Sequence, residues 1–180
     1  MKKTLLILLA LVAIVVIIYS YYGGFSSIKI DNQATQKEIL VYQSLKGDYK
    51  QSADVMNTIY QTLIEEYGIE TQKGFGIYYD NPQEVQKENL RSDVGCILNL
   101  TDSAKIVQLS SKFLIKEIPA KKYLTATFPY KGQLSIFIGI CRVYPALHHY
   151  VIKNNIHPIG AVMEVYDVPN KQIHYRIVEH

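Results

Sequence analysis

The sequence predicts an α+β fold in which a β-α-β-β unit is used twice, forming one antiparallel sheet with two helices on one face, preceded by an N-terminal transmembrane helix. Two observations support this class. Strand-period and helix-period apolar patterns follow each other in the same order in both halves of the chain. In addition, Lys46-Gly47 recurs as Lys131-Gly132 at a shift of 85, and Tyr79-Asp80 recurs as Tyr166-Asp167 at a shift of 87.

Residues 1–22 are interpreted as a membrane anchor. Lys2 and Lys3 precede an uncharged run, and residues 5–22 would form a helix of about 27 Å, just long enough for a bilayer core. A cleaved signal peptide is the alternative, but the long apolar run and the lack of an A-x-A pattern favour an uncleaved anchor that contacts the membrane through residues 4–22. The lysines place the domain on the outer (periplasmic or extracytoplasmic) side by the positive-inside rule.

Residues 23–37 read as a polar tether, and the folded domain is predicted over 38–180. In its first half, a strand with alternating apolar residues leads into a helix with one apolar stripe, which Gly68 ends as the C-cap. Two further strands flank a polar hairpin. The expected elements are strand 39–45, helix 51–67, strand 74–79 and strand 92–98.

The second half repeats this order after a connector that contains an edge strand near 113–118. Asn154-Asn155 ends its helix, and Pro145 lies inside that helix, where it removes one backbone hydrogen bond. The expected elements are strand 123–128, helix 134–153, strand 159–166 and strand 173–178.

The candidate site follows from one carboxylate in an apolar strand. Alternation places Val162, Glu164 and Tyr166 on one face and Ala161, Met163 and Val165 on the other. An isolated carboxylate in apolar surroundings costs several kcal/mol, so Glu164 requires water, a proton or a partner. If the helices cover the Met163 face, Glu164 projects into a groove on the open face. The shift of 87 adds counterparts from the first half, so the predicted ligand-binding residues are Glu164, Tyr166, Tyr79 and Ile77.

Other chemistry is not indicated. A net charge of +3 with scattered basic residues argues against a nucleic-acid surface. Histidine and cysteine spacing suggests no metal site, and no cofactor motif or catalytic triad is recognisable, so no catalytic residue is assigned. Cys96 and Cys141 have apolar neighbours and are expected to be buried free thiols, although spacing leaves a disulfide open.

The duplicated arrangement, with MEVYD at 163–167, resembles the GyrI-like effector-binding superfamily over about residues 38–180. The resemblance implies that Glu164 lies at the floor of a small-molecule pocket surrounded by aromatic rings. Within that superfamily, YKGQLSIFIGICRVYPALHHYVIKNN at 130–155 is similar to the testis-expressed ER-phagy receptor family and its bacterial relatives, most specifically in RVYPAL at 142–147. Some superfamily members are hydrolases that use a glutamate with nearby aromatic hydroxyls.

Three hypotheses follow. The first is a membrane-anchored module that binds a small apolar or cationic molecule at Glu164, where rings of Tyr79 and Tyr166 add cation–π attraction of roughly 0.5 to 2 kcal/mol each. The second is a hydrolase in which Glu164 is the general base and a tyrosine hydroxyl orients the substrate. The third is a protein-interaction module that docks a partner on the open sheet face or an edge strand.

Overall fold

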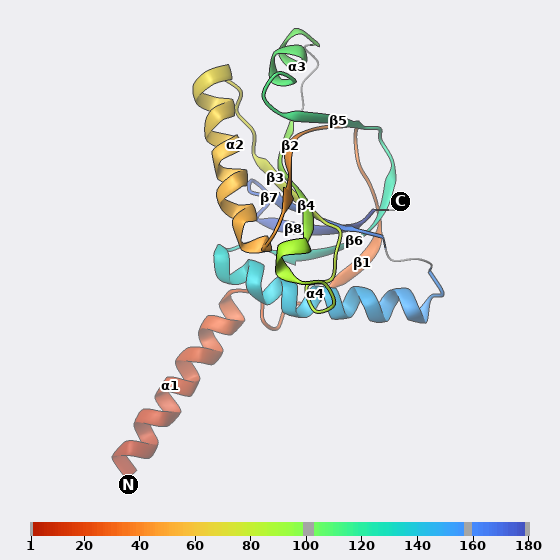
Figure 1. The fold of residues 1–180 in the computed structure, drawn as a ribbon. Coiled ribbons are helices and arrows are strands. Elements are labelled where there is room, and N and C mark those ends of the chain that lie inside the picture. Colours follow the sequence, from red (N-terminus) through yellow and green to blue (C-terminus); the bar gives the residue numbers. More distant parts are fainter. Residues whose placement is uncertain (1, 99–102, 157–159, 179–180) are drawn as a thin grey trace.

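A computed structural model of the chain describes residues 2–98, 103–156 and 160–178, with elements labelled in Figure 1. The helices are α1 (Lys2–Tyr21), α2 (Ser52–Tyr67), α3 (Ser103–Leu109) and α4 (Gln133–Lys153), and short 3₁₀ helices span Tyr49–Gln51 and Lys87–Asn89. The strands are β1 (Lys29–Ala34), β2 (Glu38–Lys46), β3 (Lys73–Tyr78), β4 (Arg91–Leu98), β5 (Leu114–Ile118), β6 (Lys122–Pro129), β7 (Val162–Asp167) and β8 (Gln172–Ile177).

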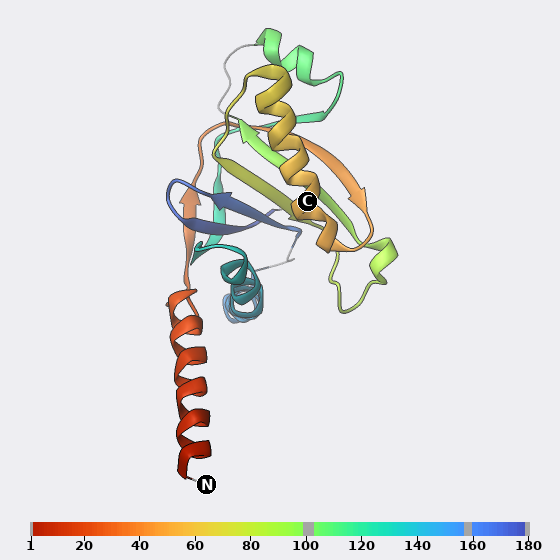
Figure 2. The same ribbon diagram turned by 90° about the vertical axis from the view of Figure 1, so that its left-hand side faces the viewer.

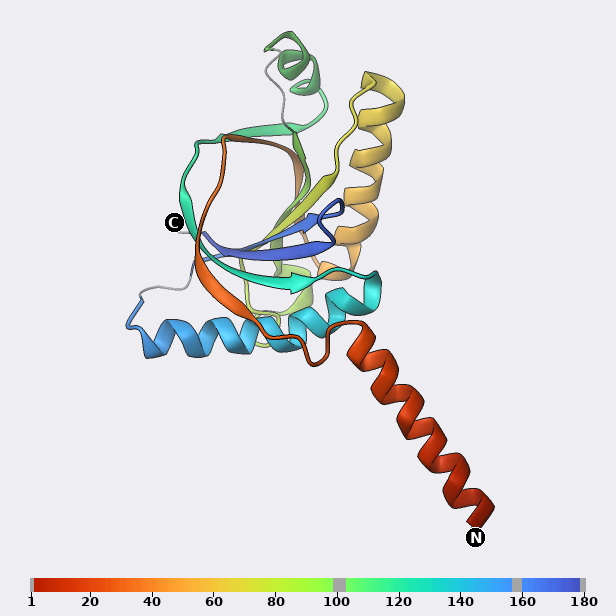
Figure 3. The same cartoon turned by 180° about the vertical axis from the view of Figure 1, so that it is seen from behind.

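All these strands belong to one antiparallel sheet in the order β1-β6-β8-β7-β3-β4-β2-β5. Strands β3 and β7 pair at its centre, so the two halves of the domain share the sheet. The sheet is strongly curved, and α2 and α4 lie on its outer side (Figure 3). The middle of the sheet is therefore the place where side chains from both halves meet.

The two predicted β-α-β-β units are present as β2-α2-β3-β4 and β6-α4-β7-β8. The edge strand expected in the connector is β5, whereas α3 was not predicted. Residues 23–37 differ from the expected polar tether, because β1 pairs with β6 from Lys29 to Ala34. Backbone hydrogen bonding thus joins this segment to the domain.

Both large helices pack on the same sheet face. Helix α2 buries Ile59 and Leu63 against β2 and β4, and α4 buries Val143 and Leu147 against β6, β7 and β8. The strand registers put the residues under both helices on one face. The opposite, inner face packs on itself through a third apolar cluster that includes Leu40, Phe75, Ile77, Ile97, Met163 and Val165.

A buried ion pair crosses this inner face. Arg176 in β8 donates two hydrogen bonds to the carboxylate of Glu38 in β2, at 2.7 and 3.1 Å, and both side chains are only 8% exposed. The guanidinium of Arg176 also lies over the ring of Tyr123, 5.5 Å from its centroid. The pair therefore links the first unit to the second with both charges compensated.

Arg176→Met is expected to lower the free energy of unfolding by about 3 to 5 kcal/mol, because it leaves the Glu38 carboxylate buried without its partner. Urea unfolding of the full chain in mild detergent, followed by tyrosine fluorescence, measures the change. The control is Lys37→Met, which breaks the Lys37–Glu117 pair, whose side chains are 59% and 53% exposed; a loss of at most about 1 kcal/mol is expected there. Equal losses in the two variants would contradict a structural role for the buried pair.

Candidate functional site

The central strands β3 and β7 lie between the areas covered by the two helices. Met56 of α2 reaches over Gly74 in β3, and Tyr144 of α4 reaches Glu164 in β7. We call this boundary between the two helices, above β3 and β7, the seam. Side chains on the helix-facing side of β3 and β7 are enclosed beneath it.

The strand register determines which residues surround Glu164. Glu164 is opposite Gly76 on β3 and opposite Tyr175 on β8. The ring of Tyr78 folds back over Gly76, where a Cβ atom would lie 2.7 Å from the Tyr78 hydroxyl oxygen. The glycine therefore leaves room for an aromatic ring beside the carboxylate.

The Glu164 carboxylate is held by two phenols. Glu164 as a residue is 2% exposed. The Tyr144 hydroxyl donates to Oε1 at 2.8 Å, and the Tyr166 hydroxyl donates to Oε2 at 2.7 Å. Because one donor comes from α4 and the other from β7, these bonds also connect the helix to the sheet.

Two more phenols complete what we call the tyrosine cluster: Tyr78, Tyr144, Tyr166 and Tyr175. The rings of Tyr144 and Tyr175 meet edge to face with centroids 5.8 Å apart. Within the described residues, the buried hydroxyl of Tyr175 has no hydrogen-bond partner. The tyrosine cluster thus includes a phenol with unused hydrogen-bonding capacity.

Burial dominates the electrostatics of this cluster. Removal from water raises the pKa of Glu164, and the hydrogen bonds from Tyr166 and Tyr144 only partly oppose that rise. Burial, followed by repulsion from the Glu164 charge, raises the pKa of Tyr78 to about 12 and the pKa values of Tyr144 and Tyr166 well above their usual range. The phenols therefore stay protonated and act as donors toward the carboxylate.

The chain contains a second buried glutamate for comparison. Glu38 is compensated by the guanidinium of Arg176. The described ion pairs of the chain include none to Glu164, and its hydrogen-bond partners are neutral phenols. Among the residues that the structure describes, Glu164 is thus buried without a compensating cation, an arrangement more typical of binding and catalytic sites than of structural cores.

The structure separates the four residues predicted to form the site. Glu164 and Tyr166 lie together, but the expectation that they point away from the helices is wrong, because α4 covers them through Tyr144. Ile77 pairs with Met163 on the inner face. Tyr79 follows β3 and donates to Asp93 at 2.6 Å, so neither Ile77 nor Tyr79 contributes to the tyrosine cluster.

The error arises from the shift used to match the halves. A shift of 87 pairs Tyr79 with Tyr166, but neighbouring residues of a strand point to opposite faces. A shift one residue longer relates Tyr78 to Tyr166 and Gly76 to Glu164 on the same face. Because Tyr78 and Tyr79 are adjacent, the sequence showed that either could be the counterpart of Tyr166. No local pattern indicated that Tyr144 and Tyr175 converge on Glu164.

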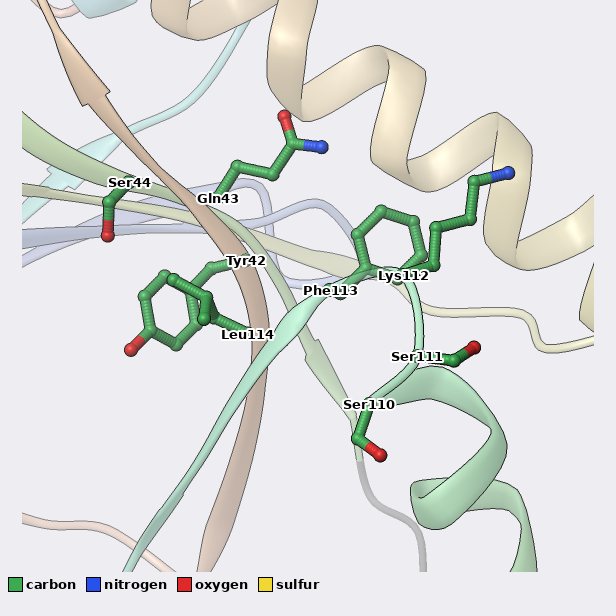
Figure 4. Close-up of a pocket in the computed structure, with 8 residues that line it drawn as sticks. All are labelled: Tyr42, Gln43, Ser44, Ser110, Ser111, Lys112, Phe113 and Leu114. Carbon is green, nitrogen blue, oxygen red and sulfur yellow. The ribbon is translucent and has the colours of Figure 1, made fainter.

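The two described hollows lie away from Glu164. The larger, of about 390 Å³, is lined by Tyr42, Gln43, Ser44 and Ser110–Leu114 (Figure 4). The other, of about 290 Å³, is lined by Ser44, Leu45, Tyr79 and Arg91–Asp93. Side chains of the tyrosine cluster line neither of them.

The remaining candidates for chemistry are thiols and metal ligands. Cys96 is buried, which raises its thiol pKa to about 12. The prediction of a buried thiol is wrong for Cys141, which is exposed. In the described part of the chain, no group of three or more His, Cys, Asp or Glu side chains is placed to hold a metal ion.

The fold places the chain in the class of α+β domains built from a duplicated β-α-β-β unit. Residues 35–173 match the GyrI-like small molecule binding domain family. The chain belongs to this family, as its sequence resemblance implied.

Similarity to individual proteins is more distant. The chain is 35% identical over 109 residues to Testis-expressed protein 264 of Homo sapiens, a match that covers 57% of this chain and 34% of that protein. In fold it is similar to the EcmrR C-terminal domain (TM-score 0.56, 13% identity, 85% of this chain and 99% of that one). It is also similar to SAV2435 bound to tetraphenylphosphonium (TM-score 0.53, 12% identity, 83% and 94%).

The raised pKa of Glu164 predicts a distinctive pH dependence of stability. The folded state holds the Glu164 proton up to a higher pH than the unfolded chain, in which glutamate titrates near about 4.3. The free energy of unfolding should therefore fall as the pH rises from that value through the folded pKa. Glu164→Gln should remove this slope and unfold at a higher urea concentration than the wild type at pH 7.

Urea midpoints between pH 4 and pH 8 measure this effect, and Glu117→Gln, at a half-exposed carboxylate, is the matched control. Carbon-13 NMR of the Glu164 carboxyl gives its pKa directly. A titration at or below about 4.3, or a Glu164→Gln variant less stable than wild type at pH 7, would contradict uncompensated burial.

Proposed function

We propose that this chain is a membrane-anchored GyrI-like domain that binds a small apolar or cationic molecule at Glu164. One observation carries the proposal: a glutamate 2% exposed to solvent is surrounded by phenols and has no described cationic partner. A ligand that brings a positive charge under the seam supplies the missing compensation. The match of residues 35–173 to a small-molecule-binding family supports the same function.

The chemistry of the site favours a lipophilic cation. Inside a poorly solvated site, attraction between a cation and Glu164 is stronger than in water. The faces of Tyr78, Tyr144, Tyr166 and Tyr175 offer cation–π contacts of roughly 0.5 to 2 kcal/mol each. Tetraphenylphosphonium, which SAV2435 binds, combines one delocalised charge with four aryl groups, so it suits such a site.

Ligand entry requires the seam to open. The carboxylate oxygens are already engaged by Tyr144 and Tyr166, and the described hollows lie elsewhere. Tyr144 is the only member of the tyrosine cluster that comes from a helix, so its displacement with α4 uncovers Glu164 while the sheet stays intact. The hydrolase alternative, with Glu164 as general base, stays a prediction.

Glu164→Gln should weaken tetraphenylphosphonium binding at least tenfold at pH 7.5, because it removes the charge while keeping the shape of the side chain. Isothermal titration calorimetry of the full chain in mild detergent measures the affinity. Wild-type affinity should also fall as the pH drops through the raised pKa of Glu164, since protonation removes the same charge.

Neutral triphenylphosphine oxide provides the control for charge, and its affinity should change less than threefold in Glu164→Gln. Glu117→Gln should leave the binding of both compounds unchanged. Equal affinity of wild type and Glu164→Gln for the cation would exclude Glu164 as the anionic partner.

We also propose that residues 4–22 anchor the domain. Helix α1 is long and apolar enough to cross a membrane, and its side chains are exposed throughout, so it contributes nothing to the core. Lys2 and Lys3 favour a cytoplasmic N-terminus, with the domain on the outer side. These features suit an anchor better than a core helix.

The expected result is that the full chain co-sediments with phospholipid vesicles after alkaline carbonate washing and keeps its intact mass of 20.6 kDa. Leu9→Arg combined with Val12→Arg should release the protein, because each arginine at the centre of a span costs about 2.5 to 3.5 kcal/mol. Leu114→Arg, at an exposed position of the domain, should have no effect. A shortened mass would instead identify α1 as a cleaved signal.

A further inference from the structure

Helix α4 carries mostly apolar residues on the side that faces away from the sheet. Six of its ten exposed positions are apolar: Leu134, Phe137, Ile140, Cys141, Pro145 and Ile152; the other four are Gln133, His148, His149 and Lys153. Phe137 is 65% exposed and Ile152 is 61% exposed. Since the inward side is buried against the sheet, α4 carries apolar residues on two opposite sides, which is unusual for a helix on a domain surface.

Helix α2 provides an internal comparison, because it covers the same sheet face in the equivalent unit. The exposed positions of α2 are almost all polar or acidic: Ala53, Asp54, Asn57, Thr58, Gln61, Glu65 and Glu66. The fold therefore tolerates a polar outer face on such a helix. The apolar outer face of α4 needs another explanation.

The position of α4 in the domain provides an explanation for its apolar outer face. Helix α4 runs along the end of the domain from which α1 projects (Figures 1 and 2). Arg142 of α4 donates to the backbone oxygens of Gly23 and Ser26, each at 2.8 Å, and the Lys131 ammonium lies 4.4 Å from the centre of the Tyr21 ring. The end of the proposed anchor is thus fastened to α4 itself.

The charges around α4 suit a phospholipid surface. The helix contains no Asp or Glu, and Lys131 and Lys153 stand at its two ends. Phe25, which is 68% exposed, adds an aromatic side chain next to the Arg142 contacts. Apolar residues along one face with flanking cations are characteristic of helices that lie in the membrane interface.

We propose that the outer face of α4 lies in the bilayer interface beside α1, so that the domain rests on the membrane instead of standing away from it. This inference rests on the proposed anchoring by α1. The occupant of the apolar face is then the lipid headgroup and upper acyl region, which Leu134, Phe137 and Ile152 enter.

Fluorescence quenching by spin-labelled lipid tests this inference in the full chain. An environment-sensitive fluorophore is attached to Cys141, which is exposed, while Cys96 is buried and unreactive. The matched control carries the fluorophore at Asn57→Cys on the outer face of α2, in a Cys141→Ser background. The protein is reconstituted in phosphatidylcholine vesicles with phosphatidylglycerol, and the nitroxide is placed near the top of the acyl chain.

Quenching at Cys141 is expected to be at least threefold stronger than at position 57. Combining Phe137→Glu with Ile152→Glu should abolish that difference while co-sedimentation through α1 continues. Equal quenching at the two positions in co-sedimenting protein overturns the inference alone. Shielding of the fluorophore that grows with the protein-to-lipid ratio would show that a second copy of the chain covers the outer face of α4, and it would also overturn the inference. Loss of co-sedimentation would refute both the inference and the anchoring by α1.

Discussion

The burial of the Glu164 carboxylate without a cation is the constraint on which the rest of the site depends. A charge in such a position destabilises the fold unless donors surround it, and here the donors are phenols from β7 and from α4. The chain buries Glu38 differently, with a guanidinium at hydrogen-bond distance. The two glutamates show that this fold can bury a carboxylate beside an arginine, and that among the described residues no such cation accompanies Glu164 at the seam.

Most elements could be predicted from the sequence because their signals are local. The apolar periods of α2 and α4 and the alternation in β2, β4 and β8 each depend on residues within one element. The site could be predicted only in part. Alternation shows that Glu164 and Met163 point to opposite faces, but both faces of this sheet are buried, so apolarity alone did not tell which one the helices cover. A one-residue error in matching the halves then exchanged Tyr78 for Tyr79.

The tyrosine cluster was beyond prediction for a physical reason. Tyr144 and Glu164 are twenty residues apart, and their contact depends on how α4 crosses the sheet, which helical periodicity does not specify. The outer face of α4 was hidden in a similar way. One buried apolar stripe was predicted for this helix from the sequence, and a second, exposed one was not. The structure shows that Leu134, Phe137 and Ile152 remain exposed on the side of α4 away from the sheet.

One helix therefore connects the proposed membrane contact, the proposed anchor and the proposed ligand site. On its inner side, Tyr144 holds Glu164; on its flank, Arg142 holds the backbone at Gly23 and Ser26; on its outer side, Phe137 and Ile152 are exposed. These residues belong to a single continuous helix, α4. On the proposed route of entry, in which Tyr144 moves together with α4, opening the seam also shifts the helix that carries the apolar outer face. The two proposals, ligand binding at Glu164 and contact of α4 with the membrane, together predict that each event influences the other, because Tyr144 and the outer face belong to the same helix.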